Sequence, residues 1–237
     1  GKVLDVVGLT IEATGPAMRI GDLCYVQGKN PSERTPVEVV GFRGSRVLLM
    51  ALGDIQGIGP NSLLIPTFKP QVIRVGMELL GRVIDGTGAP IDGGAPFTPP
   101  HEVPLTAIPP KPMERRRITE PVSTGIRAID ACITCGKGQR VGILAGSGVG
   151  KSKLMGMIAR HTSADVNVIA LIGERGREVR EFIEGDLGTT GRARSVVVAV
   201  TSDQPALLRI KGAYAATAVA EFFRDQGADV VLMMDSV

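Results

Sequence analysis

The sequence predicts a small N-terminal β-barrel followed by an α/β domain built on a parallel sheet. Three observations lead to this fold class. Residues 1–69 contain short β-rich segments separated by turn signals. From residue 124 onward, helix-like segments alternate with apolar strand-like segments, as in repeated β-α units. A glycine-rich loop lies between the first strand-like segment of this second region and the helix-like segment after it.

The composition is that of an ordinary globular chain and excludes several functional classes. The length of 237 residues suits one large or two small domains. A net charge of +3, with 3% aromatic residues and no Trp, argues against a nucleic-acid-binding surface. No apolar run approaches the roughly 18 residues that a membrane span needs. Three cysteines, and no apolar core of signal-peptide length at the start, favour a cytoplasmic protein.

Residues 1–69 are expected to form the barrel. Residues 28–31 and 43–45 have turn chemistry, and the second of these is short enough for a hairpin. The pattern leaves open whether this is a generic β-domain or a collar that assembles subunits. The expected strands are residues 3–8, 22–27, 37–42 and 46–52.

Residues 70–237 are expected to form the second domain, beginning with an extended segment. Nine of the 16 prolines lie between Pro90 and Pro121, so residues 90–121 are predicted to be a stiff, extended strap and not a helix. Asp85-Gly86 and Asp92-Gly93 are turn signals before and within it. The basic residues 115–117 are interpreted as a solvated surface.

The remainder alternates between helix and strand. Strand 166–172 is apolar except for Asn167, as expected for a buried parallel strand. The last strand ends on Asp235. The expected helices are residues 125–132, 151–161, 178–187 and 202–226, and the expected strands are 139–145, 166–172, 195–200 and 230–234.

The glycine loop has the chemistry of a phosphate-binding P-loop. An expected strand leads into the loop, and an expected helix follows it. The loop matches the pattern G-x-x-x-x-G-K-[ST], except that Ala145 stands at the first glycine position. Small residues let backbone N–H groups approach phosphates, and the helix N-terminus favours anions. Lys151 is expected to reach the β- and γ-phosphates, and Ser152 to bind Mg²⁺. The predicted nucleotide-binding residues are Ala145, Gly146, Ser147, Gly148, Val149, Gly150, Lys151, Ser152 and Lys153.

Two further strands end in residues that suit phosphoryl transfer. Asp235, after an apolar strand, has the Walker B arrangement that holds Mg²⁺, partly through water. Glu174 follows strand 166–172, where it could orient the attacking water, and Arg175 could neutralise γ-phosphate charge. An alternative is that Glu174 and Arg175 only begin a charged helix. The site is therefore predicted to bind Mg-ATP, and the candidate catalytic residues are Glu174, Lys151 and Arg175.

Several motifs resemble those of the flagellar and type III secretion export ATPases, which are relatives of the catalytic subunit of rotary ATP synthases. The resemblance covers essentially the whole chain, includes Ala145, and favours the flagellar branch. It rests on residues 145–152, 173–178, 191–197, 223–227 and 234–236.

The resemblance implies a RecA-like P-loop NTPase domain in which Glu174 is the catalytic glutamate. Non-catalytic ATP synthase subunits carry Gln at that position. The resemblance also implies that the protein is a cytoplasmic homohexamer, located at the inner face of the membrane. This hexamer would hydrolyse ATP to energise protein export. The implied partners are stator-like and stalk-like proteins, export chaperones and their substrates, and the export gate, but not nucleic acid.

The same resemblance implies that this chain is truncated after the Walker B strand and also lacks an N-terminal extension. The adenine-facing aromatic and the trans-acting arginine are missing, and loss of such an arginine costs roughly 10³–10⁵ in turnover. The chain alone is therefore expected to bind nucleotide weakly and hydrolyse almost none. The alternative functions are a hexameric RNA translocase and a subunit that binds ATP without hydrolysing it.

Other reactive side chains are expected to be structural. Cys132 and Cys135 form a single C-x-x-C without the second pair that zinc needs. His101 and His161 are expected at the surface. The core is expected to contain Met155, Met157, Met233 and Met234.

Overall fold

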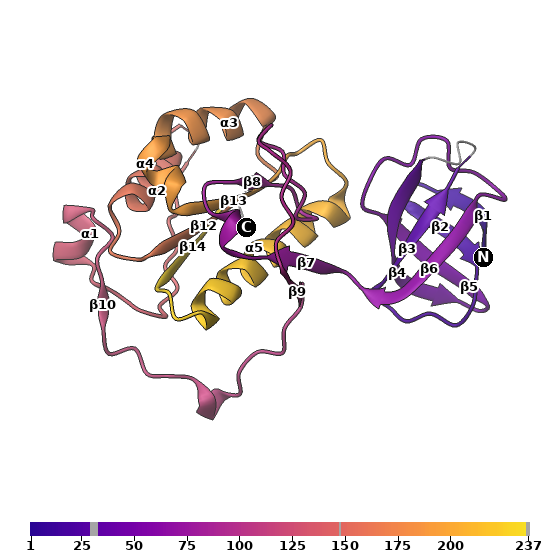
Figure 1. Ribbon diagram of the computed structural model, residues 1–237, viewed down its shortest axis with the longest axis horizontal. Helices are drawn as coiled ribbons and strands as arrows, with labels where there is room; N and C mark the ends of the chain where they lie inside the picture. Colours follow the sequence, from indigo (N-terminus) through magenta and orange to yellow (C-terminus); the bar gives the residue numbers. More distant parts are fainter. Residues whose placement is uncertain (29–32, 147, 236–237) are drawn as a thin grey trace.

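A computed structural model describes residues 1–28, 33–146 and 148–235 of the chain. A β-barrel and an α/β domain are joined by the link from β6 to β7 (Figure 1). The barrel strands are β1 (Lys2–Val7), β2 (Thr10–Thr14), β3 (Asp22–Gln27), β4 (Arg34–Arg43), β5 (Arg46–Ala51) and β6 (Leu63–Pro70).

The barrel is closed in the order β1-β2-β5-β4-β3-β6, with Lys2 of β1 opposite Leu63 of β6. Alternate side chains of each strand fill its interior, so that Val37 and Val39 of β4 are fully buried. The expected hairpin at residues 43–45 is confirmed: Arg43 pairs with Arg46, and Gly44 has a φ of 59°. Strands β2 and β6 were not expected from the sequence.

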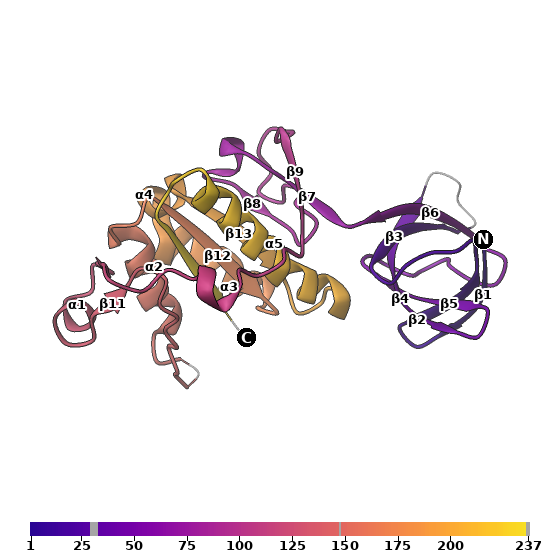
Figure 2. The same cartoon turned by 90° about the horizontal axis from the view of Figure 1, so that it is seen from below.

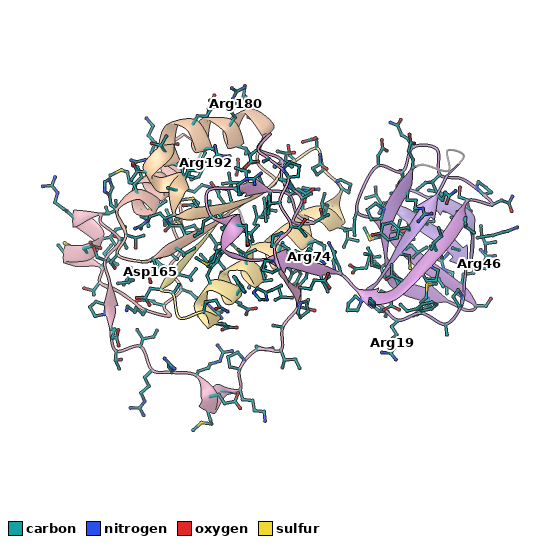
Figure 3. All side chains as sticks on the ribbon, viewed as in Figure 1. Arg19, Arg46, Arg74, Asp165, Arg180 and Arg192 are labelled. Carbon is teal, nitrogen blue, oxygen red and sulfur yellow. The ribbon has the colours of Figure 1, made fainter. Side chains whose placement is uncertain are left out.

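A second region contains short elements and the proline-rich strap. Here β7 (Val72–Val75) pairs with β9 (His101–Pro104). Arg74 of β7, labelled in Figure 3, forms an ion pair with Glu102 of β9 at 2.6 Å. The other short strands are β8 (Val83–Ile84), β10 (Pro121–Val122) and β11 (Cys135–Gly136), and the 3-10 helices are Met77–Leu79 and Pro112–Glu114. Between β9 and β10 the strap arcs away from the domain, as expected for an extended segment (Figure 1).

The parallel sheet has the order β14-β12-β13-β8. Its strands β12 (Val166–Ile172) and β13 (Ser195–Val200) agree with the predicted strands. Strand β14 (Val230–Asp235) is one residue longer than predicted. The two-residue strand β8 adds an edge that the sequence did not indicate.

Helices cover both faces of this sheet. Helix α5 (Ala206–Asp225) lies on one face, and on the other lie α2 (Lys151–His161), α3 (Gly176–Glu181), a π-helix (Phe182–Leu187) and α4 (Gly188–Ala193) (Figures 1 and 2). Val168 and Val198 point toward α5, whereas Ile169 and Val197 point toward α2. This alternation explains why β13 is apolar after Ser195 and why β12 is apolar at all but one position. Asn167, the polar exception, donates to Ala159 O at 2.9 Å and thereby links β12 to α2.

The strand predicted at residues 139–145 is wrong. These residues have no regular secondary structure, although helix α1 (Arg127–Cys132) forms before them. Leu144 is 98% exposed, and no described strand pairs with the segment. A cavity of about 550 Å³ separates the segment from β14, with Val141 and Leu232 among its lining residues. A strand needs a neighbour for its N–H and C=O groups, and within the described residues this segment has none.

The residues expected to be structural or at the surface differ in how deeply they are buried. Cys135 is buried while Cys132 is exposed, and no cluster of three or more metal-ligating His, Cys, Asp or Glu side chains occurs among the residues described. His101 and His161 are exposed. Met155 belongs to the core, but Met157 is 41% exposed and was wrongly assigned to it.

Candidate functional site

The glycine loop leads directly into α2, which begins at Lys151 as predicted. Gly150 precedes the helix with a φ of 99°, and Gly148 has a φ of 76°. Residues with a Cβ rarely adopt these values, so glycine is required at both positions. The first turn of α2 presents N–H groups without intrahelical partners, which favour an anion. Ser147, one of the predicted binding residues, lies outside the described residues.

Lys151 and Asp235 meet between α2 and the end of β14. Lys151 Nζ forms an ion pair with Asp235 Oδ1. The Asp235 side chain is 5% exposed and that of Lys151 is 32% exposed. The hydrogen bond to Asp235 raises the pKa of Lys151, and the charges of Asp235 and Glu174 act in the same direction against the effect of burial. The ammonium group is thus held charged.

Glu174 joins this pair from the end of β12. The register places Leu171 opposite Asp235, so Glu174 follows β12 at the edge of the sheet where β14 ends. Burial raises the pKa of Glu174; a hydrogen bond with Glu178 and the charge of Asp235 raise it further, and Lys151 lowers it. A carboxylate with a raised pKa near an ammonium group is suited to accept a proton.

Backbone contacts fix the segment that carries Glu174. Gly173, with a φ of 79°, donates its N–H to Val200 O at 2.7 Å. Ser202 donates its N–H to Glu174 O at 3.0 Å. The turn after β12 is therefore tied to the turn between β13 and α5.

Arg175 does not join the cluster in this structure. Its side chain is 68% exposed, and Nη1 lies 3.3 Å from Glu178 Oε1. The local sequence explains this pairing, because Arg175 precedes α3 and Glu178 lies one turn further along. Among the residues described, the structure brings together Lys151, Asp235 and Glu174, whereas Arg175 faces solvent.

The donor set fits Mg²⁺ held jointly with a phosphate. One or two carboxylates with substrate phosphates and water are the usual ligands of this ion. Asp235 offers a carboxylate whose buried Oδ1 has Lys151 as its ion-pair partner and no other described hydrogen bond. Ser152 offers a hydroxyl from the exposed first turn of α2. These oxygen ligands are too few to bind the ion without a nucleotide.

Sequence reasoning missed two contributors to this site. Glu178 lies four residues after Glu174, a spacing that places two side chains on one side of a helical turn. That spacing was a usable signal. The backbone N–H of Ser202 could not be found in this way, because any residue supplies such a group.

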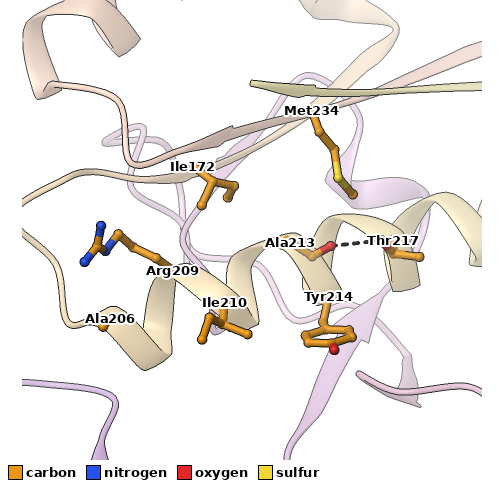
Figure 4. Close-up of a pocket in the computed structure, with 8 residues that line it drawn as sticks. All are labelled: Ile172, Ala206, Arg209, Ile210, Ala213, Tyr214, Thr217 and Met234. Carbon is orange, nitrogen blue, oxygen red and sulfur yellow. Dashed lines mark hydrogen bonds between the residues drawn. The ribbon is translucent and has the colours of Figure 1, made fainter. Parts of the chain in front are cut away.

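A separate cavity of about 540 Å³ lies between α5 and the ends of β12 and β14 (Figure 4). It is lined by Ile172, Ala206, Arg209, Ile210, Ala213, Tyr214, Thr217 and Met234. None of the predicted site residues belongs to this lining. The cavity is therefore distinct from the cluster of Lys151, Asp235 and Glu174.

No helix among the described residues is long and apolar enough to cross a membrane.

Residues 3–67 match the ATP synthase alpha/beta family, beta-barrel domain, and residues 125–237 match the nucleotide-binding domain of the same family. Both matches agree with the observed fold, because the first covers the closed barrel and the second covers the glycine loop and strands β12, β13 and β14 of the parallel sheet.

Individual relatives are similar over the whole chain. The flagellum-specific ATP synthase of Bacillus subtilis is 54% identical over 100% of this chain and 54% of the relative. The type 3 secretion system ATPase of Xanthomonas euvesicatoria is 49% identical over the same shares. The chain thus spans about half the length of these relatives.

A solved structure has the same arrangement of barrel and sheet. The assembled ATPase EscN, in complex with its central stalk EscO from the enteropathogenic E. coli type III secretion system, gives a TM-score of 0.90 with 47% identity. The match covers 100% of this chain and 57% of EscN. The barrel and the nucleotide-binding domain both match the family, and the export ATPases are similar over the whole of this chain. The chain therefore belongs to the ATP synthase alpha/beta family.

Proposed function

We propose that the protein containing this chain hydrolyses ATP to energise protein export, acting as a ring-forming subunit of a flagellar or type III secretion apparatus. The convergence of Lys151, Asp235 and Glu174 at one edge of the sheet carries the proposal. The names of the relatives, flagellum-specific and type 3 secretion ATPases, support the export role. The assembled EscN structure supports a ring with a central stalk.

Each residue of the site has a distinct part in this reaction. Lys151 and the first turn of α2 bind the β- and γ-phosphates. Asp235 and Ser152 hold Mg²⁺, which neutralises phosphate charge when bound. Glu174 polarises the attacking water and accepts its proton, a role that needs the ionised carboxylate. Arg175, now paired with Glu178, would have to turn from solvent to stabilise the γ-phosphate.

A binding measurement on this chain tests the site without requiring turnover. Lys151→Ala should weaken Mg-ATP binding about 10- to 150-fold, because a charged hydrogen bond contributes about 1.5–3 kcal/mol. Lys69→Ala, an exposed lysine of the barrel, is the matched control and should bind like the wild type in isothermal titration calorimetry. Equal affinity of the two variants would refute the assignment of the loop.

The raised pKa of Glu174 predicts the pH dependence of turnover. Glu174 must be ionised to act as a base, so activity should fall as pH drops through a pKa above the ordinary value of about 4.3. Glu178→Gln removes a hydrogen-bonded carboxyl that raises this pKa. Its pH–kcat profile in the complete encoded protein should therefore have its acidic limb at lower pH than the wild type. A limb that stays in place or moves upward would contradict this role of Glu178.

A further inference from the structure

Glu38 is an outward-facing residue of the barrel that is nevertheless buried. Val37 and Val39, its neighbours on β4, point into the barrel core, so Glu38 points outward. Leu23 of β3 and Met50 of β5 lie opposite it in the strand register. A carboxylate on the outside of a small barrel is normally exposed, yet Glu38 as a whole residue is only 7% exposed.

The first turns of α5 cover this part of the barrel. Lys211 Nζ lies 2.5 Å from Glu38 Oε2, and the two side chains are 13% and 10% exposed. Figures 1 and 2 both show the N-terminal end of α5 directed at the barrel. An apolar cluster surrounds the contact and combines residues of both domains: Leu23, Met50, Leu52, Ile172, Val200, Leu207 and Leu208.

A nearly dry ion pair fixes the relative position of the elements that carry it. Removing one partner leaves the other charge buried and unpaired, which is strongly unfavourable. The pair therefore favours one placement of α5 against β4. The apolar cluster alone would tolerate sliding, because apolar contacts have no direction.

The same end of α5 is tied to the catalytic glutamate. The turn between β13 and α5 contains Ser202, whose N–H donates to Glu174 O at 3.0 Å. Close packing keeps α5 against the sheet: a Cβ on Gly212 would lie 2.6 Å from Val200 Cγ2 and 2.9 Å from Ile172 Cδ1. A displacement of the first turns of α5 would thus move the turn that holds Glu174.

We propose that Lys211, through its ion pair with Glu38, is a positioning residue for Glu174, so that the barrel helps to set the geometry of the hydrolytic site. The inference rests on the proposed function for the role of Glu174 in hydrolysis. The mechanical link from barrel to α5 to Glu174 does not depend on that role and can be tested separately.

Hydrogen exchange measured by mass spectrometry tests the link on this chain. Lys211→Met and Glu38→Gln should each speed amide exchange in residues 171–177 and 201–205 by about 2- to 30-fold, the range expected for coupled positions. The charge-reversed double variant, Lys211→Glu with Glu38→Lys, should restore at least part of the protection. Lys137→Met is the matched control, because it breaks a different ion pair, in which Lys137 Nζ lies 2.7 Å from Asp229 Oδ2.

Turnover by the complete encoded protein tests the positioning role. Lys211→Met should lower kcat for ATP about 10- to 100-fold, since small misplacements of a catalytic group have effects of this size. KM should change by less than about twofold, because the phosphate-binding loop is not involved.

The outcomes separate the two proposals. Unchanged exchange in residues 171–177 in both single variants, or the same change in Lys137→Met, would overturn the link. If Lys211→Met does not fold, Glu38→Gln, which alters only the barrel, carries the test. If the wild type does not hydrolyse ATP, the proposed function fails while the exchange result still decides the link. A raised KM with unchanged kcat would overturn the positioning role.

Discussion

Replacing Glu174 with glutamine in the complete encoded protein should lower kcat for ATP hydrolysis by about 10²–10⁴-fold, the usual contribution of a positioned general base. The amide keeps the shape of the side chain but cannot accept a proton. ATP affinity should remain within about threefold of the wild type, because phosphate binding depends on Lys151 and the loop. Steady-state turnover and calorimetric binding measure the two effects.

Glu181→Gln provides the control for this substitution. Glu181 lies at the end of α3, on the same segment of the chain as Glu174, but is exposed to solvent, so its variant should retain wild-type turnover. If the Glu174 variant kept full activity, Glu174 could not be the base. If it lost binding and turnover together, Glu174 would instead be required for the architecture of the site. The expected result would also separate a hydrolase from a subunit that only binds ATP.

The parts of the fold that the sequence predicted well depend on local patterns. Helix α2 begins where the glycines end and Lys151 starts an amphipathic stretch. Strands β12 and β13 are apolar runs that contain one polar residue each, Asn167 and Ser195. In each case the signal lies within the element itself. The glycine loop is likewise signalled by its own residues, and Asp235 by the apolar strand that it ends.

The errors arose where structure depends on a distant partner. Residues 139–145 are as apolar as a strand, but a strand also requires a hydrogen-bonding neighbour, and no described strand provides one. The edge strand β8 has only two residues and is a strand because it pairs with β13. The contact between Lys211 and Glu38 joins a helix to a barrel strand from the other domain. No periodicity of either segment could indicate it.

Substitution of Asp92 is expected to have the second large effect, which is a loss of folding stability. Its side chain is 4% exposed and accepts hydrogen bonds from Arg82 Nε at 2.7 Å and Nη2 at 2.8 Å. The N–H groups of Val83 and Gly94 also donate to it, and Nη2 of Arg192 lies 3.3 Å away. This carboxylate therefore joins the turn after β8 to the end of α4.

Asp92→Asn should lower the free energy of unfolding by about 3–5 kcal/mol at neutral pH, because it leaves the largely buried Arg82 without its counter-ion. Urea denaturation followed by far-ultraviolet circular dichroism measures the loss. The helical signal reports on the α/β domain and not on the barrel, because all the described α-helices lie after residue 126. The control is Glu102→Gln, which breaks the exposed pair with Arg74 and should cost less than about 1 kcal/mol. Equal costs for the two variants would contradict the prediction.

The pH dependence of this loss has a definite sign. The hydrogen bonds from Arg82 hold the pKa of Asp92 well below its usual range. A carboxyl with a depressed pKa in the folded state stabilises the fold above its unfolded pKa of about 3.9, and this contribution is lost as pH falls toward the folded value. The gap between wild type and Asp92→Asn should therefore be largest at neutral pH and shrink below about pH 4. A gap that stayed constant or widened on acidification would show that Asp92 acts through packing alone, because only the ionised carboxylate gains from Arg82.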